Sequence, residues 1–89
     1  MPTISIFYGI TVYMFYFDDK NHHKPHIHIN YAEYDASISI ESGEIIACDF
    51  PKKKLKLVQA WIEIHKDELN ADWKLAIQGD SLFKIAPLQ

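Results

Sequence analysis

The chain has 89 residues, a length that suits one domain over 1–89 and not two. Its apolar content of 48% and charged content of 24% are ordinary for a folded globular protein and exclude a disordered chain. The formal net charge is −3, and all nine basic residues are lysines. Tight stand-alone binding to nucleic acid usually needs a basic face with arginine, so this composition argues against that class.

The cysteine content and the N-terminus indicate where the protein works. Cys48 is the single cysteine, which excludes an internal disulfide and fits a reducing compartment. The first residues lack the basic start and apolar run of a signal peptide, and no apolar run approaches a membrane span. We therefore expect a cytoplasmic protein without a membrane segment, with Cys48 as a small packing residue.

Alternating apolar residues predict a sheet in the first half of the chain. Thr3–Tyr8 reads as one strand, and Ile10–Phe17, apolar on nearly both faces, reads as a central strand. Asp18–Lys24 is a polar loop. The remaining expected strands are Pro25–Tyr31, Tyr34–Glu41 and Glu44–Cys48.

The pairing of these strands can be tested on the sequence. A two-residue turn at 32–33 places His26 opposite Ser39 and Ile27 opposite Ile38. Apolar then meets apolar on one face and polar meets polar on the other, which is the condition that specifies a register. For the next hairpin, with its turn at 42–43, the expected pairs are Ile45 with Ile40 and Ala47 with Ile38.

The second half of the chain predicts two helices. Pro51 opens the first, and apolar residues at three-four spacing carry it to Leu69. Asn70 is expected to cap a second helix over Ala71–Gln78, which Gly79 ends. The residues expected to face inward from the second helix are Trp73, Ala76 and Ile77, and the tail 82–88 is expected to pack back as an extended segment, with Leu82, Phe83 and Ile85 as its apolar residues.

These elements together predict an α+β domain. It would consist of a small antiparallel sheet of four or five strands, with two C-terminal helices packed on its apolar face. The opposite face would then be open and polar.

Histidines dominate that polar face. Four of the five histidines fall between positions 22 and 28. On a strand, His26 and His28 project to one face while the isoleucines beside them project to the other. Two such imidazoles can serve as general base and general acid, since histidine titrates near neutrality. With His22 or His23 from the loop they could instead hold a divalent metal such as zinc, or they could simply be polar-face residues.

Other polar residues offer weaker candidates. His65 lies on the apolar stripe of the first helix and is expected to be half-buried, bonded to a backbone carbonyl. A run of lysines in the first turns of that helix could contact phosphate. Such a run is usually a solvated face, but its placement against the helix dipole mildly favours a role in binding a partner. The lysines of this run are Lys52, Lys53, Lys54 and Lys56. Carboxylates that could orient a histidine or complete a metal shell are Asp35, Glu41 and Glu44.

Several segments together resemble a bacterial family of small proteins known as domain of unknown function 4160. They are the start Met1–Ser5, the central Pro25–Tyr31, and a C-terminal pattern of Trp61, His65, Trp73, Gly79 and Pro87. The family's central pattern, His-x-Pro-Pro-His-x-His, is matched by His22, Pro25, His26 and His28, with Lys24 in place of the first proline. The family often carries an arginine near position 6, where this chain has Ile6.

The resemblance implies a role in a two-gene module. Members are typically encoded beside a protein of the domain of unknown function 2442 family, and the pair looks like a toxin–antitoxin module with this type as the toxin-like half. The leading hypothesis is therefore a toxin-like protein acting on RNA or translation, with His26 and His28 as the acid–base pair and the lysine run contacting phosphate.

Two further hypotheses stay open at this point. One is a metal-binding domain built on His22, His26 and His28. The other is a non-catalytic domain that docks its cognate antitoxin-like partner through a strand edge or the polar face. The sequence also allows a homodimer. It leaves open whether the protein is an enzyme.

Overall fold

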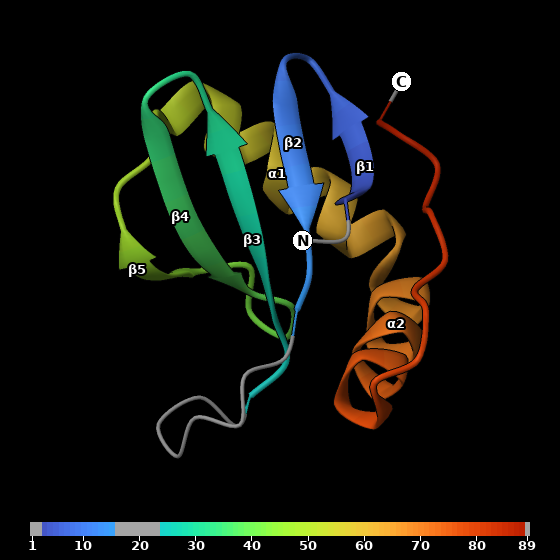
Figure 1. Ribbon diagram of the computed structural model, residues 1–89. Coiled ribbons are helices and arrows are strands. Elements are labelled where there is room, and N and C mark those ends of the chain that lie inside the picture. Colours follow the sequence, from blue (N-terminus) through green and yellow to red (C-terminus); the bar gives the residue numbers. More distant parts are fainter. Residues whose placement is uncertain (1–2, 16–23, 89) are drawn as a thin grey trace.

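The computed structural model describes residues 3–15 and 24–88. Within them, five strands form one antiparallel sheet in which each strand pairs with the next along the chain, and two helices follow (Figure 1). The strands are β1 (Thr3–Phe7), β2 (Ile10–Tyr13), β3 (His26–Tyr31), β4 (Tyr34–Ser39) and β5 (Ile45–Cys48); the helices are α1 (Lys52–Ile64) and α2 (Lys66–Gln78). The expected α+β architecture is confirmed.

The sheet buries one face and leaves the other open. Ile27 and Ile29 of β3 are fully buried, and the residues that alternate with them are half-buried. The buried face packs against α1, which lies behind the sheet in Figure 1, and α2 adds Leu69 and Trp73 to the same core. Burying one large apolar side chain contributes about 1.5–3 kcal/mol, so the two isoleucines alone orient β3 strongly.

The register expected between β3 and β4 is confirmed at every position. His26 lies opposite Ser39, Ile27 opposite Ile38, and the remaining pairs follow in step to the turn at 32–33. Ala32 adopts a left-handed backbone conformation in this turn, with φ of +54°. That conformation costs a residue with a Cβ atom roughly 1–2 kcal/mol, which the burial of the isoleucine pairs outweighs.

The register expected between β4 and β5 is wrong. Ile45 lies opposite Ile38 instead of Ile40, because the connection is longer than a two-residue turn. The Ser39 N–H donates to the carbonyl of Glu44 at 2.9 Å, so β4 ends at Ser39 and residues 40–44 form the loop. The other observed pairs, across an irregularity between Ser37 and Ile38, are Ser37 with Ala47 and Ala36 with Cys48.

The break between the helices lies at His65, not at Asn70 as expected. His65 leaves helical geometry, with φ of −110° and ψ of 24°, and α2 begins at the next residue. Asp67 and Glu68 stand in the first turn of α2, where negative charge is favourable to the helix dipole. The apolar stripe continues across this break, which is why residue spacing did not reveal it.

The helix ends are otherwise close to expectation. Pro51 immediately precedes α1, and Gly79 ends α2 in the left-handed conformation that glycine adopts at low cost. Ile77 was expected to face inward and is 49% exposed, while Trp73 is buried as expected.

No helix among the described residues has the length and apolar character to cross a bilayer.

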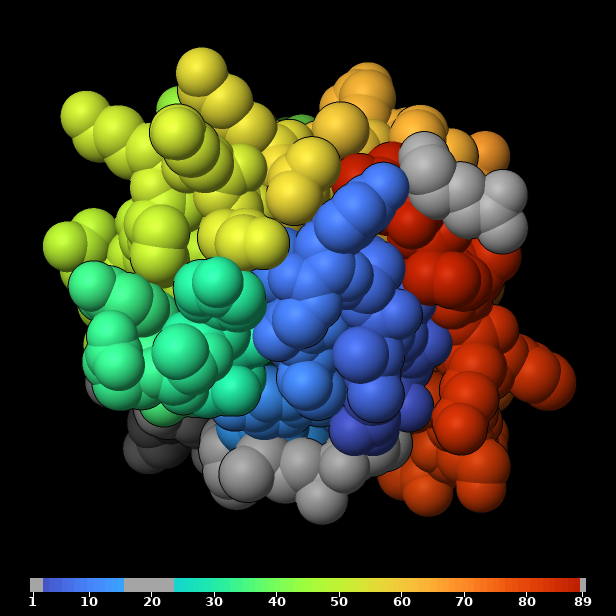
Figure 2. All heavy atoms as spheres, turned by 90° about the horizontal axis from the view of Figure 1, so that it is seen from above, coloured from blue at the N-terminus to red at the C-terminus, as the bar shows by residue number. Residues whose placement is uncertain are grey.

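The C-terminal tail packs back along β1, as expected, and lies beside it in Figure 2. The Ile85 N–H donates to the carbonyl of Ile4 at 2.8 Å, and Ile85 is buried. Phe83 was expected to be part of this packing, but its side chain is 72% exposed. Two further bonds hold the tail: Trp61 Nε1–H donates to the Ala86 carbonyl at 2.8 Å, and the Phe83 N–H donates to Asp72 Oδ1 at 3.0 Å.

Asp72 is a buried carboxylate in this arrangement. It is 2% exposed, and its Oδ2 atom has no hydrogen-bond partner among the described residues. Burial raises the pKa of Asp72 above its ordinary value of 3.8, the charge of Glu68 raises it further, and the Phe83 N–H opposes this shift. Because the Asp72 carboxyl binds its proton more tightly in the folded than in the unfolded protein, protonation stabilises the fold. This contribution is fully present below pH 3.8 and is lost as pH rises through the folded-state pKa of Asp72.

Substitution of Asp72 tests this balance. Asp72→Asn keeps an acceptor for the Phe83 N–H and removes the titrating charge. We expect the melting temperature of the wild type, relative to Asp72→Asn, to fall as pH rises from acidic to neutral. Thermal unfolding at a series of pH values measures the difference, with Asp80→Asn as an exposed control that should show no such trend. A difference independent of pH would contradict the assignment.

Candidate functional site

The open face of the sheet carries the histidine pair. His26 and His28 alternate with the buried isoleucines of β3, so both project to the open side. Register places Tyr13 of β2 and Ser37 of β4 on either side of His28. The other residues on this face of β2, β3 and β4 are Thr11, Asn30, Asp35 and Ser39.

His26 is held in one tautomer when neutral. Its Nδ1 atom lies 2.9 Å from the carbonyl oxygen of Lys24, which can only accept a hydrogen bond. Nδ1 must therefore carry the proton and donate it to Lys24. The lone pair of the neutral ring then resides on Nε2, the atom that can take a proton or bind a metal.

His28 is held by contacts on both sides of β3. Its Nδ1 atom lies 3.2 Å from Ser37 Oγ, within hydrogen-bond distance. Its ring stacks almost parallel on Phe15, with centroids 4.2 Å apart, and on Tyr13 at 5.6 Å. The His26 and His28 rings meet edge to face at 5.1 Å.

Trp73 of α2, from the other half of the chain, contacts His26. Its ring centroid lies 5.0 Å from that of His26. We call Tyr13, Phe15, His26, His28 and Trp73 the ring cluster. Sequence reasoning found its histidines but not its aromatic residues. Tyr13 could have been found by extending the register from β3 to β2. Phe15 lies beyond the end of β2, and no local pattern points to Trp73.

A polar hollow adjoins the ring cluster. It has a volume of about 280 Å³ and is lined by Thr3, Thr11, Tyr13, Asn30 and Asp35. Asn30 Nδ2–H donates to Asp35 Oδ1 at 2.9 Å and to the Tyr34 carbonyl at 3.2 Å, which orients the carboxylate. Burial raises the pKa of the Tyr13 phenol, and the charge of Asp35 raises it further, so the phenol stays protonated at neutral pH.

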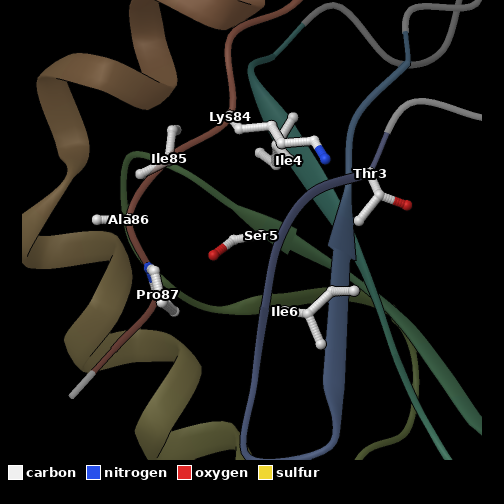
Figure 3. A pocket seen from close by; sticks show the side chains of 8 residues that line it. All are labelled: Thr3, Ile4, Ser5, Ile6, Lys84, Ile85, Ala86 and Pro87. Carbon is white, nitrogen blue, oxygen red and sulfur yellow. The ribbon is translucent and has the colours of Figure 1, made fainter.

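A separate cavity of about 390 Å³ lies between β1 and the tail (Figure 3). Ser5 is buried, its hydroxyl points into the space between the two segments in Figure 3, and its Oγ has no partner among the described residues. The lining is otherwise mostly apolar and contains neither a histidine nor a carboxylate, so it offers no acid–base pair. The lining residues are Thr3, Ile4, Ser5, Ile6, Lys84, Ile85, Ala86 and Pro87.

The fold places Lys54 of the lysine run away from the histidines. Lys54 Nζ donates to the Tyr8 carbonyl at 3.2 Å and lies 4.8 Å from the Tyr31 ring centroid. Tyr31 is at the opposite end of β3 from His26, roughly 16 Å away at about 3.3 Å per residue. The other lysines of the run, which are exposed on α1, are Lys52, Lys53 and Lys56.

The remaining candidates lie outside the ring cluster. His65 is half-buried as expected, but its Nδ1–H donates to Glu68 Oε1 at 2.6 Å and not to a backbone carbonyl. Cys48 is exposed and so does not pack as expected. Glu41 and Glu44 are exposed in the β4–β5 connection.

The metal-binding reading cannot be completed from the described residues. Within 3–15 and 24–88, no group of three histidine, cysteine, aspartate or glutamate side chains is arranged to hold a metal ion. His22, the third ligand expected from the sequence, and His23 lie outside the described residues.

The tautomer of His26 can be measured directly. Nitrogen-15 NMR of the folded protein with a neutral His26 ring should show a protonated Nδ1 and an unprotonated Nε2. The same spectrum of the urea-unfolded protein, where the Lys24 contact is absent, supplies the control. An Nε2–H tautomer in the folded protein would rule out the hydrogen bond to Lys24.

Comparison with known protein families identifies a matching family. A family model described as domain of unknown function (DUF4160) matches residues 9–74, more than half of the chain. The matched segment contains the whole ring cluster and leaves out β1 and the tail. No curated protein and no solved structure gives a significant match. The chain belongs to the DUF4160 family.

Proposed function

We propose that this protein is the toxin-like component of a two-protein module and cleaves RNA by general acid–base catalysis. The main support for the proposal is the histidine pair. The ring centroids of His26 and His28 lie 5.1 Å apart, and the Nδ1 atom of each ring lies within hydrogen-bond distance of a protein oxygen. Each Nδ1 is thus engaged within the protein, and we assign the proton transfers to the two Nε2 atoms, of which that of His28 is buried in the described structure. Acid–base pairs of this kind need no metal to cleave RNA.

The two histidines suit different roles. His26, with its neutral lone pair on Nε2, would take the proton from the ribose 2′-hydroxyl, whose oxygen then attacks the phosphorus. His28 can carry a proton on both nitrogens, because the Ser37 hydroxyl is able to accept from Nδ1–H. It would give its Nε2 proton to the departing 5′-oxygen, leaving a 2′,3′-cyclic phosphate.

The aromatic members of the ring cluster support RNA as the substrate. Proteins that bind single-stranded RNA commonly stack its bases on aromatic side chains of a sheet surface. Tyr13 stands on such a surface, and Phe15, just beyond the end of β2, stacks on both Tyr13 and His28. A base stacked here would bring its own phosphate near the acid–base pair.

The partner and the lysine run have separate places in this proposal. The partner would be a small antitoxin-like protein, as the resemblance to paired bacterial families implies. Because Lys54 is engaged at the opposite end of β3 from His26, we assign Lys52, Lys53 and Lys56 to phosphates farther along the RNA or to the partner. Both proteins would work in the cytoplasm.

Alanine substitution of the histidines tests the catalytic role. Expression of the wild type should arrest growth, and the double variant His26→Ala/His28→Ala should relieve the arrest. Each single substitution should slow RNA cleavage by about 10²–10⁴-fold, the usual contribution of one acid or base. Both histidines are half-buried on the open face, so circular dichroism should show a folded double variant.

Asp80→Asn, on an exposed residue after α2, is the matched control and should still arrest growth. Arrest by a folded His26→Ala/His28→Ala protein would refute the acid–base assignment.

The distance between the two imidazole rings also supports a second function, the binding of a divalent metal. Two imidazoles that bind one tetrahedral zinc through Nε2, with Zn–N bonds of about 2.0–2.1 Å, have ring centres roughly 5 Å apart. The observed separation of His26 and His28 is 5.1 Å. A carbonyl that accepts from Nδ1–H, as Lys24 does from His26, is also typical beside metal-bound histidine.

Metal titration separates this alternative from the first. Zinc at about 100 times its dissociation constant should raise the free energy of unfolding of chelator-treated protein by about 2.7 kcal/mol. For a domain of this size that corresponds to a rise in melting temperature of roughly 10–20 °C. His26→Ala/His28→Ala should abolish the rise. An unchanged melting temperature in the wild type would exclude metal binding at this pair.

A further inference from the structure

We propose that the polar hollow binds a guanine base of the RNA substrate. This inference rests on the proposed function, since it names the base that the same site would select. The hollow is lined by Thr3, Thr11, Tyr13, Asn30 and Asp35 and has room for a purine, at about 280 Å³.

The position of the hollow connects it to the histidines. Tyr13 belongs both to the hollow and to the ring cluster, and it lies directly opposite His28 in the β2–β3 register. Its ring stacks nearly parallel to that of His28, at an interplanar angle of 17°. A base in the hollow that packs against Tyr13 therefore lies next to the acid–base pair, and its ribose and phosphate can extend toward His28.

The carboxylate of Asp35 determines which base fits. A carboxylate only accepts hydrogen bonds, and it binds best to two donors side by side. Guanine presents two adjacent donors, N1–H and the N2 amino group, on its Watson–Crick edge. Adenine and cytosine each place an acceptor beside one donor, and uracil places its single N–H between two carbonyl oxygens. Guanine is therefore the one base of the four that can meet both carboxylate oxygens.

The surroundings of Asp35 prepare it for this role. Asn30 Nδ2–H binds Oδ1, which fixes the orientation of the carboxylate before a ligand arrives. Because Tyr13 stays protonated at neutral pH, the hollow has no second negative charge from the phenol. A carboxylate repels phosphate, so Asp35 would weaken binding of an RNA wherever it does not meet donors of a base. The hollow thus selects guanine by attraction and disfavours the other bases by an unpaired charge.

Nucleotide binding tests the inference without any cleavage. We would titrate the full chain with guanosine, adenosine, cytidine and uridine 5′-monophosphates and follow amide chemical shifts of β2–β4. The guanine nucleotide should bind about tenfold more tightly than the others, the effect of roughly 1.4 kcal/mol from the second donor. Inosine 5′-monophosphate, which lacks the N2 amino group, should bind with intermediate affinity.

Two variants test whether the Asp35 carboxylate causes the guanine preference. Asp35→Asn removes the charge on an exposed side chain and should bring the guanine affinity down to that of the other nucleotides. Asp80→Asn removes a charge elsewhere and should leave the preference intact. Equal binding of all four nucleotides by the wild type, no binding of any, or a preference that persists in Asp35→Asn would each overturn the inference.

The outcome can be distinguished from failure of the proposed function. Binding is measured in the wild type and in His26→Ala/His28→Ala, and the guanine preference should be the same in both. A guanine preference in a protein that cleaves no RNA would keep the base site and refute the catalytic role. Cleavage without regard to base would keep the catalytic role and refute the base site.

Discussion

The two-residue period of β3 is the constraint on which the rest of the structure depends. Ile27 and Ile29 are fully buried, and their burial fixes which face of the sheet packs against α1. The same alternation places His26 and His28 on the opposite, open face. A shift of one residue would expose both isoleucines and bury both imidazoles, so the histidine face is a direct consequence of core formation.

The end of β3 at which the histidines stand matters as much as the face. There Phe15, two residues beyond the end of β2, stacks on His28, and α2 brings Trp73 against His26. The imidazoles are therefore held by neighbouring rings and by oxygens at Nδ1. Lys54 is occupied at the far end of the strand, bonded to the Tyr8 carbonyl.

In the proposed function, the charge of this face favours recognition of a base over recognition of a phosphate. The hollow beside Tyr13 is lined by hydroxyls, an amide and the Asp35 carboxylate, with no lysine among its described lining residues. Such a lining gains little from a phosphate but can pair with donors on a base. Because a net charge of −3 disfavours non-specific binding to RNA, the proposed function requires that a few specific contacts hold the RNA.

The sequence by itself determined the strands that flank the turn at 32–33, their register and the face of the histidines. These follow from a side-chain period of two and from the large free energy of burying isoleucine. Only the tertiary structure decided the helix break at His65, because the apolar stripe runs unchanged from Ile62 to Leu69 across it. It also decided the β4–β5 register, through a loop longer than the shortest turn, and the ring cluster, since no local pattern brings Trp73 of α2 against His26. Local periodicity encodes which face a side chain takes, whereas contacts between distant segments depend on how the elements pack.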